Sequence, residues 1–216
     1  AEAMYTATQV GGTKGKGGDL AGVYTTVFNE WAKQRNWSSF VAYTDLKGAF
    51  HSVLHDHLFN SQLSQEDRKE LLDGVDIPLY LRPALEEVLA QPALLSSSCC
   101  PTLAATAAEA CRGCWYTVRP ADDMAAPGKG FGPGSNVSDL LFNIAESRTL
   151  KSLQDELRAH GLATKVEVAP DEPFGPSDGP ALVMDITFMD DTAVHSAHAD
   201  NRTLVARMKA TMEVIH

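Results

Sequence analysis

The chain of 216 residues has few basic side chains. Lys and Arg number 18 against 28 Asp and Glu, which gives a formal net charge of −10 at pH 7. Nucleic-acid-binding surfaces depend on Lys and Arg that neutralise phosphates, so this balance argues against a general surface of that kind. Acidic residues are concentrated between residues 61 and 90, whereas residues 1–50 are close to neutral. Any polyanion would therefore be held by a local patch.

Long hydrophobic runs are also missing. No uninterrupted apolar stretch approaches the roughly 20 residues of a membrane-spanning helix, and the N-terminus lacks the apolar core of a signal peptide. We therefore expect no membrane partner and an intracellular location, either nuclear or cytoplasmic. The first residue is Ala rather than Met, so we expect the chain to be part of a longer polyprotein. Its length suffices to bury the core of one large domain or two small ones.

Residues that could form disulfides or bind transition metals are few. The four cysteines are Cys99, Cys100, Cys111 and Cys114. Cys111-x-x-Cys114 has a spacing typical of zinc sites, but its possible partner is an adjacent Cys-Cys pair rather than a second C-x-x-C. We expect reduced thiols without a metal, with structural zinc as the alternative. Solvent-exposed histidines are likewise expected rather than a metal site. The groups concerned are His51, His55 and His57, and His195, His198 and Asp200.

A pair of adjacent carboxylates stands out in the C-terminal part of the chain. A run rich in β-branched residues, 182–188, leads into Asp190 and Asp191, and a second short apolar run follows. This pattern predicts a β-hairpin with Met189, Asp190 and Asp191 at or beside its tip. Neighbouring carboxylates repel one another unless a cation lies between them, and Mg²⁺ takes one or two such ligands. A surface turn without a metal is the alternative, because Asp is common in turns.

A third carboxylate is predicted to end a strand. Residues 40–44, Phe-Val-Ala-Tyr-Thr, predict a short strand that ends at Asp45. If this strand is a neighbour of the hairpin, the carboxylates of Asp45 and Asp190 should lie about 4–5 Å apart, within reach of one Mg²⁺ ion. The alternative is that Asp45 caps the N-terminus of a following helix.

Several helices and two glycine-rich loops are predicted around these carboxylates. The loop over residues 9–20 contains Lys14 and Lys16, which supply charges for phosphate, and the loop over 128–134 precedes a long helix that ends near residue 160. That helix start could face an anion or a nucleotide. A strand is predicted over 114–118. Other helices are predicted over 19–35 (with Leu20, Val23, Val27 and Trp31 at helical spacing), 64–74, 83–89 and 199–212.

Three motifs follow one another along the chain: Asp45-Leu-Lys-Gly-Ala-Phe50, the stretch from Gly130-Phe-Gly-Pro-Gly134 to Leu141-Phe-Asn143, and Phe188-Met-Asp-Asp191. In this order they resemble the palm of a reverse transcriptase of the non-LTR retrotransposon type. The family has an Asp followed five residues later by an aromatic, a Gly-rich turn that ends in Leu-Phe-Asn, and an aromatic-x-Asp-Asp motif. Gln9-x-Gly11 with Lys14-Gly-Lys16 resembles its Gln-Gly-basic-Gly stretch. The resemblance covers about residues 9–195.

The resemblance implies a fold class and a division of the chain. The expected fold is α+β, a polymerase palm whose antiparallel sheet is backed by helices in an arrangement close to the ferredoxin-like core. It implies partial fingers and no thumb. Residues 1–216 would form one partial reverse transcriptase domain, with 1–44 as partial fingers or lead-in and 45–216 mainly as palm. A finger-like insertion would occupy about residues 60–120.

The resemblance also implies an activity, RNA-directed DNA polymerase. dNTPs would be transferred to the 3′-hydroxyl of a DNA primer on an RNA template with the help of two Mg²⁺ ions, for which Mn²⁺ could substitute. Asp45 and Asp190 would ligate both ions, and Asp191 would assist. Phe50 would lie under the incoming sugar and select deoxynucleotides, which disfavours an RNA-templated RNA polymerase.

Further residues would contact the substrates. Those near the incoming nucleotide would be Gly130, Pro133, Gly134 and Asn143. Phe188 and Met189 would touch the primer end, and Lys14 and Lys16 would bind nucleic acid. The alternative is an inactive, transposon-derived remnant that acts as a nucleic-acid-binding module. The presence of Asp45, Asp190, Asp191 and Phe50 favours the enzyme over the remnant.

Overall fold

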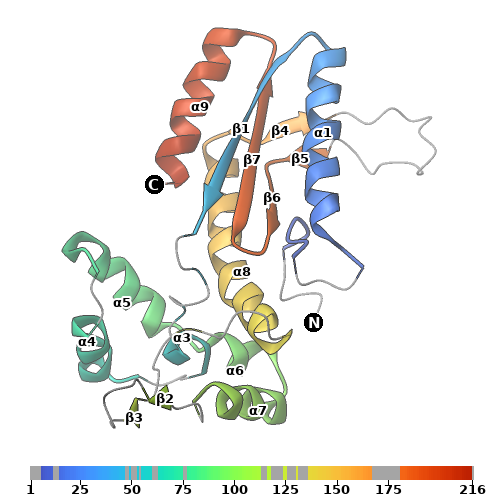
Figure 1. Cartoon of the computed structure of the whole chain (residues 1–216). Helices are drawn as coiled ribbons and strands as arrows, with labels where there is room; N and C mark the ends of the chain where they lie inside the picture. Colours follow the sequence, from blue (N-terminus) through green and yellow to red (C-terminus); the bar gives the residue numbers. More distant parts are fainter. Residues whose placement is uncertain are drawn as a thin grey trace. The chain divides into compact units, whose positions relative to one another are not determined.

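The chain divides into two compact units in the computed structural model (Figure 1). One unit contains residues 1–5 and 48–145, and the other contains residues 6–47 and 146–216. Both combine helices with small antiparallel sheets, which matches the α+β class predicted from the sequence. The structure describes residues 6–11, 15–46, 49, 53, 55–59, 63–74, 77–112, 116–117, 124–125, 130, 136–166 and 181–215.

A three-stranded antiparallel sheet forms the centre of the second unit. Its strands are β1 (Ser38–Asp45), β6 (Asp185–Phe188) and β7 (Asp191–His198), in the order β1-β7-β6. The structure therefore confirms the hairpin, which β6 and β7 form, and the strand that ends at Asp45. It also confirms that the two are neighbours, because β1 pairs with β7. A separate two-stranded sheet pairs β4 (Thr164–Val166) with β5 (Ala181–Val183).

Helices cover both faces of the three-stranded sheet. Successive residues of a strand point to opposite sides, so each strand contributes side chains to both helix layers. These helices are α1 (Gly18–Gln34), α8 (Asn136–Ala159) and α9 (Asn201–Ile215). On one face Ala193 packs with Ile186 and with residues of α1. On the other face Val194 packs with Leu157 of α8 and with the C-terminal part of α9. The carboxylate-bearing hairpin is thus built into the core.

The predicted helix over residues 19–35 is confirmed as α1, but of the four residues that the helical spacing marked three are exposed, and only Trp31 packs against the core. Leu20, Val23 and Val27 are 42%, 55% and 61% exposed. Phe28 and Ala32 are buried instead, and pack against Ala197 of β7. Helix α1 carries apolar residues on more than one side, so the spacing alone does not indicate which side meets the sheet.

The first unit is mostly helical. Its elements are α3 (His55–Phe59), α4 (Gln65–Asp73), η2 (Leu79–Leu81), α5 (Arg82–Ala90), α6 (Leu94–Ser98), α7 (Pro101–Arg112), the pair β2 (Tyr116–Thr117) and β3 (Met124–Ala125), and the start of α8. The helix predicted over residues 64–74 is confirmed as α4, and residues 64–67 form a capping box at its start. The Ser64 hydroxyl accepts from the Asp67 N–H, and the Asp67 carboxylate accepts from the Ser64 N–H. The core contains Leu58, Leu94, Leu95, Leu141 and Ile144.

Within the described ranges, no single helix is long and apolar enough to cross a membrane. Two segments, Leu79–Ser96 and Pro101–Cys111, reach that length and hydropathy only when they are counted together across a bend of 115°.

Two histidines differ from the expectation of solvent exposure. His55 and His195 are 2% and 1% exposed. His55 Nε2 lies 2.8 Å from the Gly130 carbonyl, and His195 packs edge-on between Tyr24 and Phe28 of α1. These aromatic neighbours lie far from His195 in sequence, so only the packing of α1 on the sheet accounts for its burial.

Candidate active site

Two of the predicted carboxylates face each other on neighbouring strands. Asp45 is the last residue of β1 and Asp191 the first of β7, and the two are directly opposite in the antiparallel ladder. Opposite residues point to the same face of a sheet with β-carbons roughly 5 Å apart, and like charges so placed destabilise the pair. The residue directly opposite Asp45 is therefore Asp191. We had expected Asp190 in that place.

The register of the hairpin explains this difference. Phe188 and Asp191 are paired, so Met189 and Asp190 form a two-residue turn between the strands. Met189 has a φ of 56°, a left-handed conformation that non-glycine residues adopt only when the surroundings impose it. Asp190 thus lies in the turn, one residue from the pair formed by Asp45 and Asp191.

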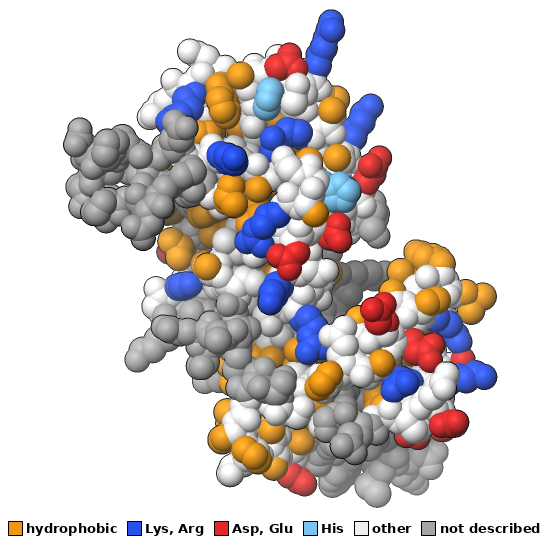
Figure 2. Space-filling model, turned by 180° about the vertical axis from the view of Figure 1, so that it is seen from behind, with side chains coloured by type: hydrophobic (Ala, Val, Ile, Leu, Met, Phe, Trp, Pro, Cys, Tyr) orange, Lys and Arg blue, Asp and Glu red, His pale blue; other side chains and the backbone are white. Residues whose placement is uncertain are grey.

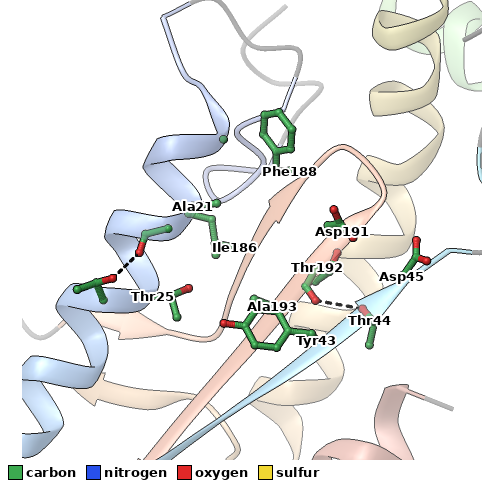
Figure 3. Close-up of a pocket in the computed structure, with 13 residues that line it drawn as sticks. Ala21, Thr25, Tyr43, Thr44, Asp45, Ile186, Phe188, Asp191, Thr192 and Ala193 are labelled. Atoms are coloured by element: carbon green, nitrogen blue, oxygen red, sulfur yellow. Dashed lines mark hydrogen bonds between the residues drawn. The ribbon is translucent and has the colours of Figure 1, made fainter. Parts of the chain in front are cut away.

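A pocket of about 600 Å³ lies between α1 and this end of the sheet (Figure 3). Asp45, Asp191 and Phe188 line it together, from three different strands. The α1 side is made of small residues, Gly18, Ala21 and Gly22, which leave the space open. The remaining lining residues are Thr25, Thr26, Tyr43, Thr44, Ile186, Thr192 and Ala193. Two carboxylates therefore share one opening with an aromatic side chain.

The donor chemistry of this pocket suits a hard cation. Magnesium is usually held by one or two carboxylates together with waters and substrate phosphates, and Asp45 and Asp191 provide two. No group of three or more His, Cys, Asp or Glu side chains able to hold a metal ion occurs among the residues with a described position. The three aspartates together do not form a closed ligand set, and a bound ion would take its other ligands from water or substrate.

Glu146 is a carboxylate near this site that the sequence did not single out. It lies on α8, is 6% exposed, and its Oε2 atom has no hydrogen-bond partner among the residues that the structure describes. Burial, and secondly the charge of Asp190, raise the pKa of Glu146 to about 8. No sequence signal marks this residue, because a glutamate in a helix is mostly exposed.

Asp185 is a second buried carboxylate that the sequence did not indicate. It begins β6, is fully buried, and accepts hydrogen bonds from Thr8 Oγ1 at 3.0 Å and from Gln154 Nε2 at 2.9 Å. Burial raises the pKa of Asp185, although these hydrogen bonds oppose that effect. An acid inside the strand-like run 182–188 is the only sequence signal, and it marks the residue without giving its partners.

The glycine-containing stretch near the N-terminus lies beside the hairpin. The Val10 N–H donates to the Thr187 carbonyl at 2.8 Å, and Gln9 forms a parallel bridge with Thr187. A β-carbon added to Gly11 would stand 2.2 Å from the Met189 nitrogen. Only glycine therefore fits against the tip at this position.

The other predicted site residues are not brought into this pocket by any described contact. Gly130 and Asn143 belong to the first unit, where the Gly130 N–H donates to the Val53 carbonyl and Asn143 is fully buried in α8. Lys16 is exposed, two residues before α1. The predicted residues Lys14, Phe50, Pro133 and Gly134 and the zinc candidate Cys114 lie outside the described residues.

Exposed basic residues are present in the second unit but do not form a uniform surface. Lys151 and Arg158 on α8 and Arg202 and Lys209 on α9 are exposed. Figure 2 shows Lys and Arg side chains mixed with acidic and apolar ones on the face that it displays. This mixture agrees with the acidic composition of the whole chain.

Comparison with models of known protein families gave no match for this chain, and comparison with curated proteins gave none. The resemblance to reverse transcriptases therefore stays a prediction from the sequence motifs.

Proposed function

We propose that the chain carries the palm site of an RNA-directed DNA polymerase, which adds dNTPs to a DNA primer on an RNA template. The observation that carries the proposal is the direct opposition of Asp45 and Asp191 at the end of the sheet, with Asp190 in the adjacent turn. Two carboxylates from motifs far apart in sequence meet at one pocket, as metal-assisted nucleotidyl transfer requires.

The residues of the pocket would divide the work of the reaction. Asp45 and Asp191 would hold the ion, with Asp190 adjacent. A bound Mg²⁺ supplies activation of the primer hydroxyl and neutralisation of the triphosphate. Phe188 gives the pocket an apolar wall against which a sugar or base can rest. A volume of about 600 Å³ falls within the roughly 300–1,000 Å³ range of small-molecule sites.

The remaining assignments of the proposal come from the resemblance. Phe50 would select deoxynucleotides. Nucleotide contacts are assigned to Gly130, Pro133, Gly134 and Asn143, primer contacts to Phe188 and Met189, and nucleic-acid contacts to Lys14 and Lys16.

Primer extension tests the proposal. The full chain is incubated with an RNA template, a DNA primer, dNTPs and Mg²⁺ or Mn²⁺, beside the variants Asp45→Asn and Asp191→Asn. Each variant should extend the primer about 100-fold or more slowly than the wild type. An effect of this size is typical when a group that stabilises developing charge is removed. Asp155→Asn is the matched control, because Asp155 is exposed and pairs with Arg158 at the surface.

The alternative function makes a different prediction in the same assay. If the folded chain shows no extension with either metal ion, the inactive, nucleic-acid-binding remnant replaces the polymerase. Extension that persists at full rate in Asp45→Asn and Asp191→Asn would also contradict the proposed site.

A further inference from the structure

Three side chains form a closed hydrogen-bonded ring beneath the hairpin. Gln154 Nε2 donates to Asp185 Oδ1 at 2.9 Å and to Thr8 Oγ1 at 2.9 Å, and the Thr8 hydroxyl donates to Asp185 Oδ2 at 3.0 Å. The ring connects α8, β6 and the N-terminal stretch of the second unit. Because each of the three side chains is hydrogen-bonded to the other two, the ring fixes the distance of Thr8 from β6.

Burying the carboxylate of Asp185 costs desolvation free energy that packing alone does not offset. A buried carboxylate is tolerated only with compensating hydrogen bonds, and a well-packed apolar residue would often be as stable. Asp185 receives its compensation from Thr8 and Gln154. These hydrogen bonds therefore hold Thr8 at one position beside β6.

The backbone continues from this ring to the tip of the hairpin. The Thr187 N–H donates to the Thr8 carbonyl at 3.0 Å, and the Val10 N–H donates to the Thr187 carbonyl at 2.8 Å. Residues 8–11, which we call the support segment, thus run along β6 on the side away from β7. The segment ends at Gly11, whose α-carbon lies directly against the backbone of Met189.

We propose that the support segment is a positioning element for the carboxylate-bearing tip, and that Thr8, Gln154 and Asp185 are positioning residues that lock it. Met189 is followed directly by Asp190 and Asp191, so a shift of its backbone moves both carboxylates relative to Asp45 on β1. The catalytic consequence rests on the proposed function, whereas the mechanical role of the segment does not.

Hydrogen exchange tests the mechanical role without any activity. In Gly11→Ala the added β-carbon displaces Met189, and amides of the peptide covering residues 186–192 should exchange at least about tenfold faster. Exchange in α9 should remain unchanged. Gly17→Ala is the matched control, because a β-carbon at Gly17 meets nothing within 4 Å. Equal tip exchange in both variants would overturn the proposal.

Changes in the ring provide a second test that does not depend on the backbone of residue 11. Thr8→Val keeps the shape of the side chain but removes the hydroxyl, and Asp185→Asn removes the acceptor for one of the two donors. Both should accelerate exchange at the tip. The double variant Asp185→Asn with Gln154→Glu reverses donor and acceptor and should restore protection. Failure of this rescue while both single variants still fold would contradict the lock.

Kinetics separate this inference from the proposed function. If the wild-type chain extends primers, Thr8→Val should lower kcat by about tenfold with less change in KM for dNTP, because Asp191 shifts relative to Asp45 while the α1 side of the pocket keeps its position. A wild-type chain without extension would refute the polymerase and leave the exchange results to decide the support segment. Extension with normal kcat in Gly11→Ala would refute the positioning role alone.

Discussion

Asp45 stands directly opposite Asp191 in the ladder between β1 and β7, at the exposed end of the sheet. Two like charges in this arrangement destabilise the folded state unless a cation lies between them. Sites that bind a cation often carry such a cost, because the groups that hold the ligand repel one another in its absence.

The first prediction concerns this repulsion. In the presence of EDTA, Asp45→Asn should raise the free energy of unfolding by about 0.2–1 kcal/mol, because one of two facing charges is removed. In millimolar Mg²⁺ the wild type should gain stability and the advantage of the variant should shrink. Urea titrations with and without the ion measure both effects. Asp155→Asn is the control, and a variant less stable than wild type in EDTA would contradict the repulsion.

The second prediction concerns Glu146. Its pKa is raised to about 8 by burial and by Asp190, so the folded state keeps a proton that the unfolded state releases from about pH 4.5 upward. The contribution of Glu146 to stability is therefore full at low pH and is lost as the pH rises to about 8. Each pKa unit is equivalent to about 1.4 kcal/mol.

Glu146→Gln removes this titration. The variant should be more stable than wild type at pH 8, by about 1 kcal/mol or more, and should approach it near pH 5. Thermal unfolding across this range measures the difference. Glu213→Gln on the exposed side of α9 is the control. A constant difference between variant and wild type at all pH values would show that Glu146 does not titrate as stated.

The third prediction concerns His195. Its Nε2 lies 2.9 Å from the Thr25 hydroxyl, and burial lowers its pKa to about 4. The unfolded chain takes up the proton near pH 6.5, whereas the folded chain does not. This histidine therefore stabilises the fold above pH 6.5, and the contribution is lost as the pH falls toward 4, by on the order of 3 kcal/mol.

His195→Leu should flatten the corresponding part of the stability profile. Comparison of wild type and variant between pH 4 and 7 isolates the effect from that of the carboxylates. His160→Gln serves as the control, because His160 is an exposed residue that pairs with Glu156. If the wild-type and His195→Leu profiles run parallel over this range, His195 is not the titrating group.

The fourth prediction concerns the first unit alone. The Ser64 hydroxyl accepts from the Asp67 N–H at 3.1 Å and caps α4. Ser64→Ala should therefore destabilise α4 by about 1 kcal/mol. Hydrogen exchange in residues 65–73 reports the loss, and peptides of the second unit should not respond. Unchanged protection of α4 would exclude an energetic role for the cap.

The local elements of this protein could be predicted from short stretches of sequence. The hairpin of β6 and β7 follows from its β-branched residues and from the adjacent carboxylates at its tip, and the start of α4 follows from its capping residues. The end of β1 at Asp45 was likewise predictable. In each case the determining interactions are between residues close in sequence, so the pattern contains the information.

Other features depend on contacts between distant residues. The two sides of α1 are both apolar enough to be buried, and the sheet selects the one with Phe28 and Ala32 because those side chains fit beside Ala197. The burial of Glu146 and Asp185 is equally invisible to local patterns, because isolated acidic residues favour water.

The sequence by itself determined that Asp45 ends a strand and that Asp190 and Asp191 belong to a hairpin. Only the tertiary structure decided that Asp191 rather than Asp190 stands opposite Asp45, and that Gly11 meets the tip. The physical reason is that register and close approach depend on how separate strands align. Shifting that alignment by one residue would reverse the face on which every side chain lies.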